Sequence, residues 1–143
     1  MRATRTVSSI LTDSKTIAVV GLSDKPERAS HGVAHYLQQQ GYRIVPVNPN
    51  CAGQQILGET AYASLQEAAA ALPGGIDIVD CFRKSEDMPA VAREAVAVGA
   101  KVLWMQLGVV NQEAADLAAA AGLDVVMDRC LKIEHAALNG GAP

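Results

Sequence analysis

The sequence of 143 residues predicts one α/β domain in which helices cover both faces of a mainly parallel, doubly wound sheet. Three observations lead to this prediction. Five short, almost uninterrupted apolar runs are typical of strands that are buried on both faces. Amphipathic segments of helical length separate the runs. Gly41, Gly99 and Gly122 each follow such a segment, at the position where a left-handed residue ends a helix.

The predicted elements alternate along the chain. Strands are expected at residues 16–21, 43–47, 76–82, 101–107 and 123–127, and helices near 30–40, 64–71, 87–98 and 111–120. Local signals support the helix starts. Ser64 and Glu67 form a capping box, Asn111 is a favourable N-cap, and Pro89 suits a first helical turn.

Two more short helices are expected, near residues 7–11 and 131–138. We therefore divide the chain into an N-terminal arm with a short helix (1–14), one ligand-binding domain (15–138) and a flexible tail (139–143). No repeat, linker or second domain is visible in the sequence.

Composition narrows the class of protein. Half of the residues are apolar and 19% are charged, which is typical of a globular chain, and the net charge of −3 argues against a nucleic-acid surface. The three cysteines have no metal-binding spacing, which favours a reducing compartment and no metal site. No apolar run suits a signal peptide or a membrane span of about 20 residues. We expect a cytoplasmic protein that binds neither nucleic acid nor membrane.

The loop after the first predicted strand is the main candidate for a ligand site. An apolar strand, Gly21, a polar loop and a helix together offer backbone N–H groups and a positive helix end to a phosphate. The dinucleotide pattern GxGxxG is absent, because Leu22 and Ser23 follow Gly21 and the next glycine is Gly32. The second strand ends in VPVNPN, without the carboxylate that grips a ribose in NAD enzymes, so ordinary NAD binding is disfavoured.

The same loop carries two cations and two hydroxyl groups, on Lys25, Arg28, Ser23 and Ser30. Arg28 can bind phosphate oxygens through two parallel hydrogen bonds, and Lys25 supplies a mobile point charge. The alternative is a solvated connection in which the carboxylates of the loop pair with these cations.

Several separate blocks of the sequence resemble one family. They are AVVGLSDKPERASHGVAHYLQQQGYRIVPVNPN, ILGETAYASL, DIVDCFRKSED, GAKVLWMQLGVVN and VVMDRCLKIEH, which together cover nearly all of residues 16–135. The chain thereby resembles the small stand-alone CoA-binding proteins, whose relatives include the nucleotide-binding domain of the succinyl-CoA synthetase alpha subunit. The resemblance implies a Rossmann-like fold that binds coenzyme A across its strand ends.

The resemblance also implies positions for the ligand. The first loop would lie against the pyrophosphate, which gives roles to Gly21, Ser23, Lys25, Arg28 and Ser30. The loop after the second strand would border the adenosine, through Asn48 and Pro49. The alternative for these two residues is a plain Asn-Pro turn.

Two further strand ends match the family. Phe82 could stack on adenine and Arg83 could reach a phosphate, or the first could be core and the second solvated. Gln106 and Gly108 match positions that line the pantetheine path of the family, whereas Trp104 is expected in the core.

The last block is the hardest to interpret. Cys130 should lie near a helix start between Arg129 and Lys132, an environment that lowers a thiol pKa and would permit a mixed disulfide with CoA. The alternative is a buried, inert thiol. His31 and His35 share a helix face, but nothing else with ligand spacing supports a metal.

Taken with the resemblance, these residues predict a protein that binds CoA or acyl-CoA without catalysis. Succinyl-CoA synthetase uses a phosphorylated histidine in a further domain, and the chain ends before such a domain. Asp77 and Asp80 are three apart in one strand, on opposite faces, and form no acid–base pair. Alternatives are an NAD(P) oxidoreductase, an acyl-CoA-dependent transferase, or a CoA-sensing regulatory module with a protein partner. The apolar helix faces are also compatible with a homodimer.

Overall fold

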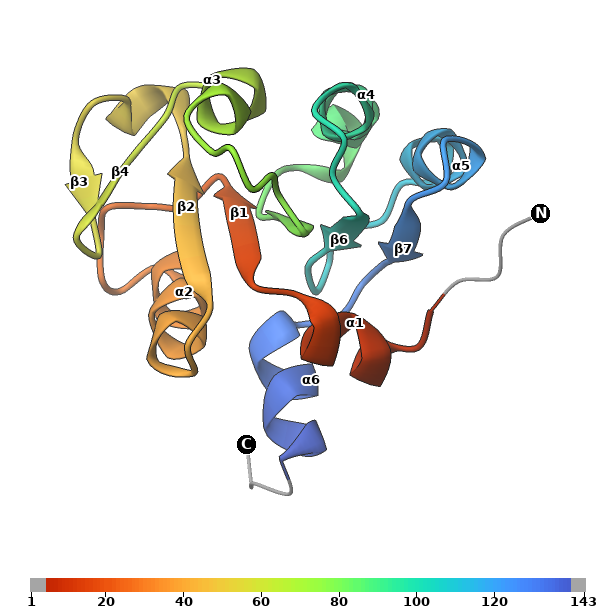
Figure 1. The fold of residues 1–143 in the computed structure, drawn as a ribbon, viewed down its shortest axis with the longest axis horizontal. Coiled ribbons are helices and arrows are strands. Elements are labelled where there is room, and N and C mark those ends of the chain that lie inside the picture. The colour runs from red at the N-terminus through yellow and green to blue at the C-terminus, as the bar shows by residue number, and fades with distance from the viewer. Residues whose placement is uncertain (1–4, 140–143) are drawn as a thin grey trace.

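Five parallel strands form the central sheet of the computed structural model, which describes residues 5–139 (Figure 1). The sheet has the order β2-β1-β5-β6-β7, and each neighbouring pair is parallel. Its strands are β1 (Thr16–Val20), β2 (Arg43–Val47), β5 (Ile78–Cys81), β6 (Val102–Met105) and β7 (Asp124–Val126). The predicted doubly wound α/β class is confirmed. No helix within residues 5–139 is long and apolar enough to span a membrane.

Helices cover both faces of the sheet (Figure 1). On one face lie α1 (Val7–Asp13), α2 (Ala29–Gln39) and α6 (Leu131–Leu138), and on the other α3 (Leu65–Ala70), α4 (Met88–Ala97) and α5 (Gln112–Ala120). The connection from β2 to β5 also contains a short hairpin of β3 (Gln55–Ile56) and β4 (Glu59–Thr60).

The strands divide the apolar core into two layers. Along β5, Ile78 packs toward α2 and α6, and Val79 packs toward α3, α4 and α5, as the alternation of a strand requires. Small side chains face the second layer: Ala92 and Ala95 of α4 and Ala118 of α5 are fully buried. Small side chains therefore make up much of this layer, in keeping with the scarcity of aromatic residues.

The helix starts follow the capping signals in the sequence. Ser64 Oγ accepts a hydrogen bond from the backbone N–H of Glu67 at 3.2 Å, and Asn111 Oδ1 accepts one from the N–H of Ala114 at 2.9 Å. These side chains satisfy amides that the first helical turn leaves without partners. The predicted helices are therefore present, with ends that differ by one or two residues from those expected.

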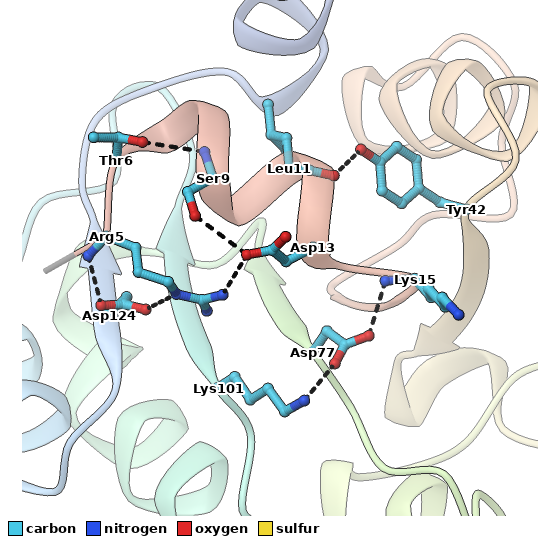
Figure 2. A network of polar contacts seen from close by, with 10 residues as sticks. All are labelled: Arg5, Thr6, Ser9, Leu11, Asp13, Lys15, Tyr42, Asp77, Lys101 and Asp124. Atoms are coloured by element: carbon cyan, nitrogen blue, oxygen red, sulfur yellow. Dashed lines mark hydrogen bonds and ion pairs between the residues drawn. The ribbon is translucent and has the colours of Figure 1, made fainter.

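The N-terminal segment belongs to the folded core. Ile10 and Leu11 of α1 are buried, and the backbone carbonyl of Leu11 accepts a hydrogen bond from the Tyr42 hydroxyl at 2.6 Å (Figure 2). Arg5 Nε lies 2.6 Å from Oδ2 of Asp124, so the chain before α1 is tied to the start of β7. Residues 1–4 of the predicted arm and 140–143 of the predicted tail lie outside the described residues.

Asp77 lies at the amino ends of the strands, where it contacts the residues just before and at the start of β1 (Figure 2). Its Oδ2 accepts hydrogen bonds from the backbone N–H groups of Lys15 and Thr16 at 2.8 and 3.0 Å, and its Oδ1 lies 3.4 Å from Lys101 Nζ. Partial burial opposes ionisation, but these contacts outweigh it and lower the pKa of Asp77. The amino ends of the strands are thus held by structural polar contacts.

The carboxyl ends of the strands are arranged differently. The chain leaves β1 through α2 to reach β2 on one side, and later returns to β5 on the other side of β1. The connections after β1 and β5 therefore depart from the sheet in opposite directions. A crevice opens at such a reversal of strand order, which is where α/β sheets bind ligands.

Candidate functional site

Gly21 brings the ends of three strands together. It directly follows β1, and its N–H donates to the carbonyl of Val47, the last residue of β2, at 2.8 Å. Its φ of +88° lies in the left-handed region, and a Cβ atom there would collide with the carbonyl oxygen of Phe82, just after β5. Only glycine meets both conditions without strain. Gly21 therefore sets how closely the loops after β1 and β5 approach.

Hydrogen bonds hold the loop that follows Gly21. The N–H of Ser23 donates to Oγ of Ser30 at 3.0 Å, and the N–H of Lys25 donates to Oγ of Ser23 at 3.1 Å. Asn48 Nδ2 donates to the carbonyl of Leu22 at 3.0 Å, which links the loop to the end of β2. These polar side chains therefore shape the loop.

A first pocket of about 470 Å³ lies between this loop and the end of β2. Its volume falls in the range of about 300–1,000 Å³ that is common for small-molecule sites. The residues that line it are Gly21, Ser23, Asp24, Lys25, Arg28, Ala29, Ser30, Asn48, Asn50, Cys51 and Phe82.

Charge in the first pocket is predominantly positive. Lys25 and Arg28 line it, and within residues 5–139 neither forms an ion pair with Asp24 or Glu27. The first residues of α2, Ala29 and Ser30, line the pocket, and within the described part of the chain no side chain caps this helix. The pocket therefore offers two cations and a helix start to an anion.

A second pocket of about 340 Å³ lies beside the first. Pro49 and Arg83 line the second pocket, so they are separated from their neighbours Asn48 and Phe82, which line the first. Arg83 Nη2 lies 3.9 Å from Oδ2 of Asp87, which is a loose ion pair one turn along the chain.

The structure does not bring the remaining predicted residues into either pocket. Gln106 is buried, and its Nε2 donates to Oδ1 of Asp80 at 2.7 Å. Gly108 lies in an exposed loop, where its N–H donates to Oδ1 of Asp128 at 2.7 Å. Cys130 is half-buried at the start of α6 and packs against the core.

Asp80 is a strongly perturbed titratable group near these strand ends. It is fully buried, and within the described residues its Oδ2 has no hydrogen-bond partner. Burial raises the pKa of Asp80 from 3.8 to about 7, although the hydrogen bond from Gln106 acts in the opposite direction. The sequence predicted that Asp80 forms no acid–base pair with Asp77, but carried no sign of its complete burial beside Gln106.

Sequence reasoning also missed Asn50 and Cys51 in the wall of the first pocket. Asn50 is the last residue of the VPVNPN segment and Cys51 follows it, and both lie in a short 3₁₀ turn (Pro49–Cys51) that Asn48 caps. Asn48 Oδ1 accepts a hydrogen bond from the N–H of Asn50 at 3.0 Å, which folds the turn back toward the loop after β1. The Asn-Pro turn signal was therefore the available clue.

Comparisons with known proteins bear on the family and on the fold. A family model described as a CoA binding domain matches residues 15–136. The Bacillus subtilis (strain 168) protein YneT, described as uncharacterized, is 47% identical over 130 residues, 91% of this chain and 92% of YneT. The structure described as cell-free ID.343 from Thermus thermophilus has a TM-score of 0.86 and 39% identity, and the match covers 92% of this chain and 96% of that one. A hypothetical protein from Pyrococcus horikoshii OT3 has a TM-score of 0.85 and 38% identity, and the match covers 98% and 100% of the two chains.

Proposed function

The chain belongs to the CoA binding domain family, and from this premise we propose that it binds coenzyme A or an acyl-CoA at the carboxyl ends of β1, β2 and β5. The phosphates of the ligand occupy the first pocket. The main support for this proposal is a pair of cations, Lys25 and Arg28, which line this pocket and form no ion pair within residues 5–139.

The chemistry of the ligand suits this pocket. Coenzyme A carries a pyrophosphate and a 3′-phosphate, and both need positive charge or N–H donors once they leave bulk water. Arg28 lies at the start of α2, so its guanidinium group and the helix end act on the same region of the pocket. Lys25 adds a second charge from the preceding loop.

The adenosine lies toward the end of β2 in this proposal. Phe82 is half-buried and lines the first pocket, so part of its ring packs on the core and part remains open for stacking on a base. Asn48 acts on the ligand through the loop, because its amide is hydrogen-bonded to the carbonyl of Leu22 and to the N–H of Asn50.

We further propose that binding is not coupled to a chemical step in the first pocket. Of the described residues that line it, one is a carboxylate, Asp24, and none is a histidine. Histidine is the side chain that most often acts as a general acid or base. The proposed role is to hold or sense CoA in the cytoplasm.

Isothermal titration of the full chain tests the ligand class. We expect CoA and acetyl-CoA to bind, and NAD and NADP to bind more weakly, because the end of β2 lacks the carboxylate that grips a ribose. Tighter binding of NAD than of CoA would favour the alternative of a nicotinamide enzyme.

A double variant tests the phosphate site. Lys25→Ala/Arg28→Ala should weaken CoA binding about 30-fold, on the basis of roughly 1 kcal/mol for each exposed cation, and should flatten the salt dependence of affinity. Lys15→Ala/Arg43→Ala is the matched control, since it removes the same charges from exposed positions at the amino ends of β1 and β2. Equal affinities of the two double variants would remove the first pocket as the phosphate site.

A further inference from the structure

Asp80 lies on the same side of the sheet as the first pocket. It pairs with Val19 of β1 and with Trp104 of β6, and both of these side chains belong to the core layer next to α2 and α6. Paired residues of neighbouring parallel strands point to the same side, so the Asp80 side chain enters this layer too. The first pocket opens beside the same helix, since Ala29 and Ser30 at the start of α2 line it.

Asp80 also lies directly below the floor of this pocket. Phe82 comes two residues after Asp80, Gly21 comes two residues after Val19, and both Phe82 and Gly21 line the first pocket. The ladder between β1 and β5 continues to this level, because the N–H of Phe82 donates to the carbonyl of Val20 at 2.8 Å. Two residues of a strand advance by roughly 7 Å, so a phosphate in the pocket would lie on the order of 10 Å from the carboxyl group.

The carboxyl group of Asp80 has little to stabilise a negative charge. Its Oδ1 accepts one hydrogen bond, from Nε2 of Gln106 at 2.7 Å, and within the described residues its Oδ2 has no hydrogen-bond partner. The residue is fully buried, so an ionised carboxylate would lie in the core with a single neutral donor. Burial of this kind favours the protonated form.

The elements around Asp80 do not supply a compensating charge. β1 and β6 contain no ionisable side chain, and the buried side chains of α2 are Ser30, Val33, Ala34 and Leu37. The remaining ionisable groups of α2 and of the α6 region include His31, His35, Asp128, Arg129, Lys132 and His135.

Several of these groups are engaged elsewhere. His135 Nδ1 lies 2.9 Å from the Tyr36 hydroxyl, and Arg129 Nη1 lies 3.3 Å from Oε1 of Glu134. Above Asp80, the loop after β1 contributes Lys25 and Arg28 to the pocket. The pKa of Asp80 is nevertheless set by its burial and by Gln106, and not by any of these charges.

A bound phosphate would add a strong negative charge to this surrounding. A pyrophosphate carries about two charges, and at a distance on the order of 10 Å and an effective dielectric between those of a protein surface and of water its repulsion changes the protonation equilibrium of Asp80 about 10-fold. Lys25 and Arg28 do not cancel this change, since they are present with and without the ligand. The protonated form of Asp80 therefore favours the ligand.

We infer that Asp80 couples ligand binding to proton uptake: the chain binds the phosphates of CoA with Asp80 protonated, and above neutral pH it takes the required proton from the solvent. This inference rests on the proposed function, since it requires the phosphates in the first pocket. Below about pH 7 the free protein already holds the proton, and pH has no effect through Asp80. Between about pH 7 and pH 8 the affinity falls, by about 10-fold in all, until the complex loses the proton as well.

Carboxyl NMR titration of the wild-type chain tests this coupling directly. Saturation with CoA should move the titration midpoint of Asp80 from about pH 7 to about pH 8. An unchanged midpoint in the presence of bound CoA would overturn the inference. This measurement depends on no variant.

Calorimetry in two buffers of different ionisation enthalpy counts the protons taken up on binding. At pH 7.5 the wild type should take up about half a proton more than Asp80→Asn, and at pH 5.5 the two should be equal. Asparagine keeps the carbonyl that accepts from Gln106 and stays neutral, so it imitates the protonated form. Protons exchanged by other groups, such as the 3′-phosphate of CoA, cancel in this comparison.

Asp77→Asn is the matched control, because Asp77 lies just before the same strand but at its amino end. It should take up as many protons as the wild type. Equal uptake by the wild type and Asp80→Asn at pH 7.5 would contradict the coupling. Gln106→Leu tests whether Asp80 acts through its proton or only through its packing. Loss of the donor raises the pKa of Asp80, so the fall in affinity should move to higher pH, and a fall that stays in place would overturn the inference.

The affinity of the wild type at pH 6 separates the two proposals, because Asp80 is protonated there with or without ligand. If CoA does not bind at pH 6, the proposed function fails and the inference fails with it. If CoA binds at pH 6 and leaves the titration midpoint of Asp80 unchanged, only the inference is overturned. If Asp80→Asn does not fold, the NMR titration of the wild type decides.

Discussion

Replacement of Asp80 by asparagine changes a carboxyl group that the fold buries completely at the end of β5. Burial raises the pKa of Asp80 from 3.8 to about 7, and its Oδ1 accepts a hydrogen bond from Nε2 of Gln106 at 2.7 Å. The folded protein therefore keeps this proton up to about pH 7, whereas the unfolded chain releases it near pH 4. Unfolding releases a proton between these values, so the free energy of unfolding of the wild type falls as the pH rises through this window.

The linkage relation gives the magnitude. One pH unit corresponds to about 1.4 kcal/mol per proton, so the wild type loses roughly 4 kcal/mol between about pH 4 and pH 7 from Asp80 alone. About two of these pH units lie above pH 5, which leaves a loss of about 3 kcal/mol between pH 5 and pH 8. An asparagine in place of Asp80 would keep the carbonyl that accepts from Gln106 and would not titrate, so Asp80→Asn should lack this loss.

Urea unfolding followed by circular dichroism measures the effect in both proteins at pH 5, 6, 7 and 8. The quantity of interest is the difference between the two free energies of unfolding. Burial lowers the pKa of His135, so this side chain adds stability as the pH rises toward 6.5 in both proteins, and its contribution cancels in the difference. A difference that stays constant from pH 5 to pH 8 would show that Asp80 is not protonated in the fold, and would refute the reasoning.

Three further predictions concern the residues around the strand ends. Gly21→Ala should lower the free energy of unfolding by about 2 kcal/mol more than Gly41→Ala does, because both glycines have a positive φ but only a Cβ at position 21 collides with a backbone carbonyl. Urea unfolding measures both variants, and equal losses of stability would contradict the collision. Asp77→Asn should cost about 2 kcal/mol at pH 7 and progressively less below pH 4, since the lowered pKa of Asp77 stabilises the fold only while the group is ionised; a loss that does not change with pH would exclude this cause. Gln106→Leu should raise the pKa of Asp80 above about 7, because it removes the donor that favours the ionised form, and carboxyl NMR titration would detect an unchanged value.

Local sequence signals predicted the five strands of the central sheet, the α-helices and their order, but not the β3–β4 hairpin. The strand preceding Gly21, the cap at Ser64 and the cap at Asn111 all appear where the sequence places them. Such signals act between residues that are close in sequence, so they do not depend on how distant segments pack. The alternation of strands and helices in turn predicted a parallel sheet with a crevice at its carboxyl edge.

Contacts between distant segments could not be predicted in the same way. Asp80 and Gln106 are 26 residues apart, and they meet because Asp80 pairs with Trp104 in the parallel register of β5 and β6. Gln106 lies two residues beyond Trp104 and therefore faces the same side of the sheet. A shift of this register by one residue would place the Gln106 side chain on the opposite face and leave Asp80 without its donor.

The sequence by itself determined that this chain forms an α/β sheet, and it predicts a phosphate-binding loop after the first strand because strand, glycine, cations and helix are neighbours in the chain. Only the tertiary structure decided which residues share a pocket. Asn48 and Pro49 are adjacent in sequence but face different pockets, as do Phe82 and Arg83. These pairs lie where the chain leaves a strand, and which pocket each side chain meets depends on the order in which the strands assemble.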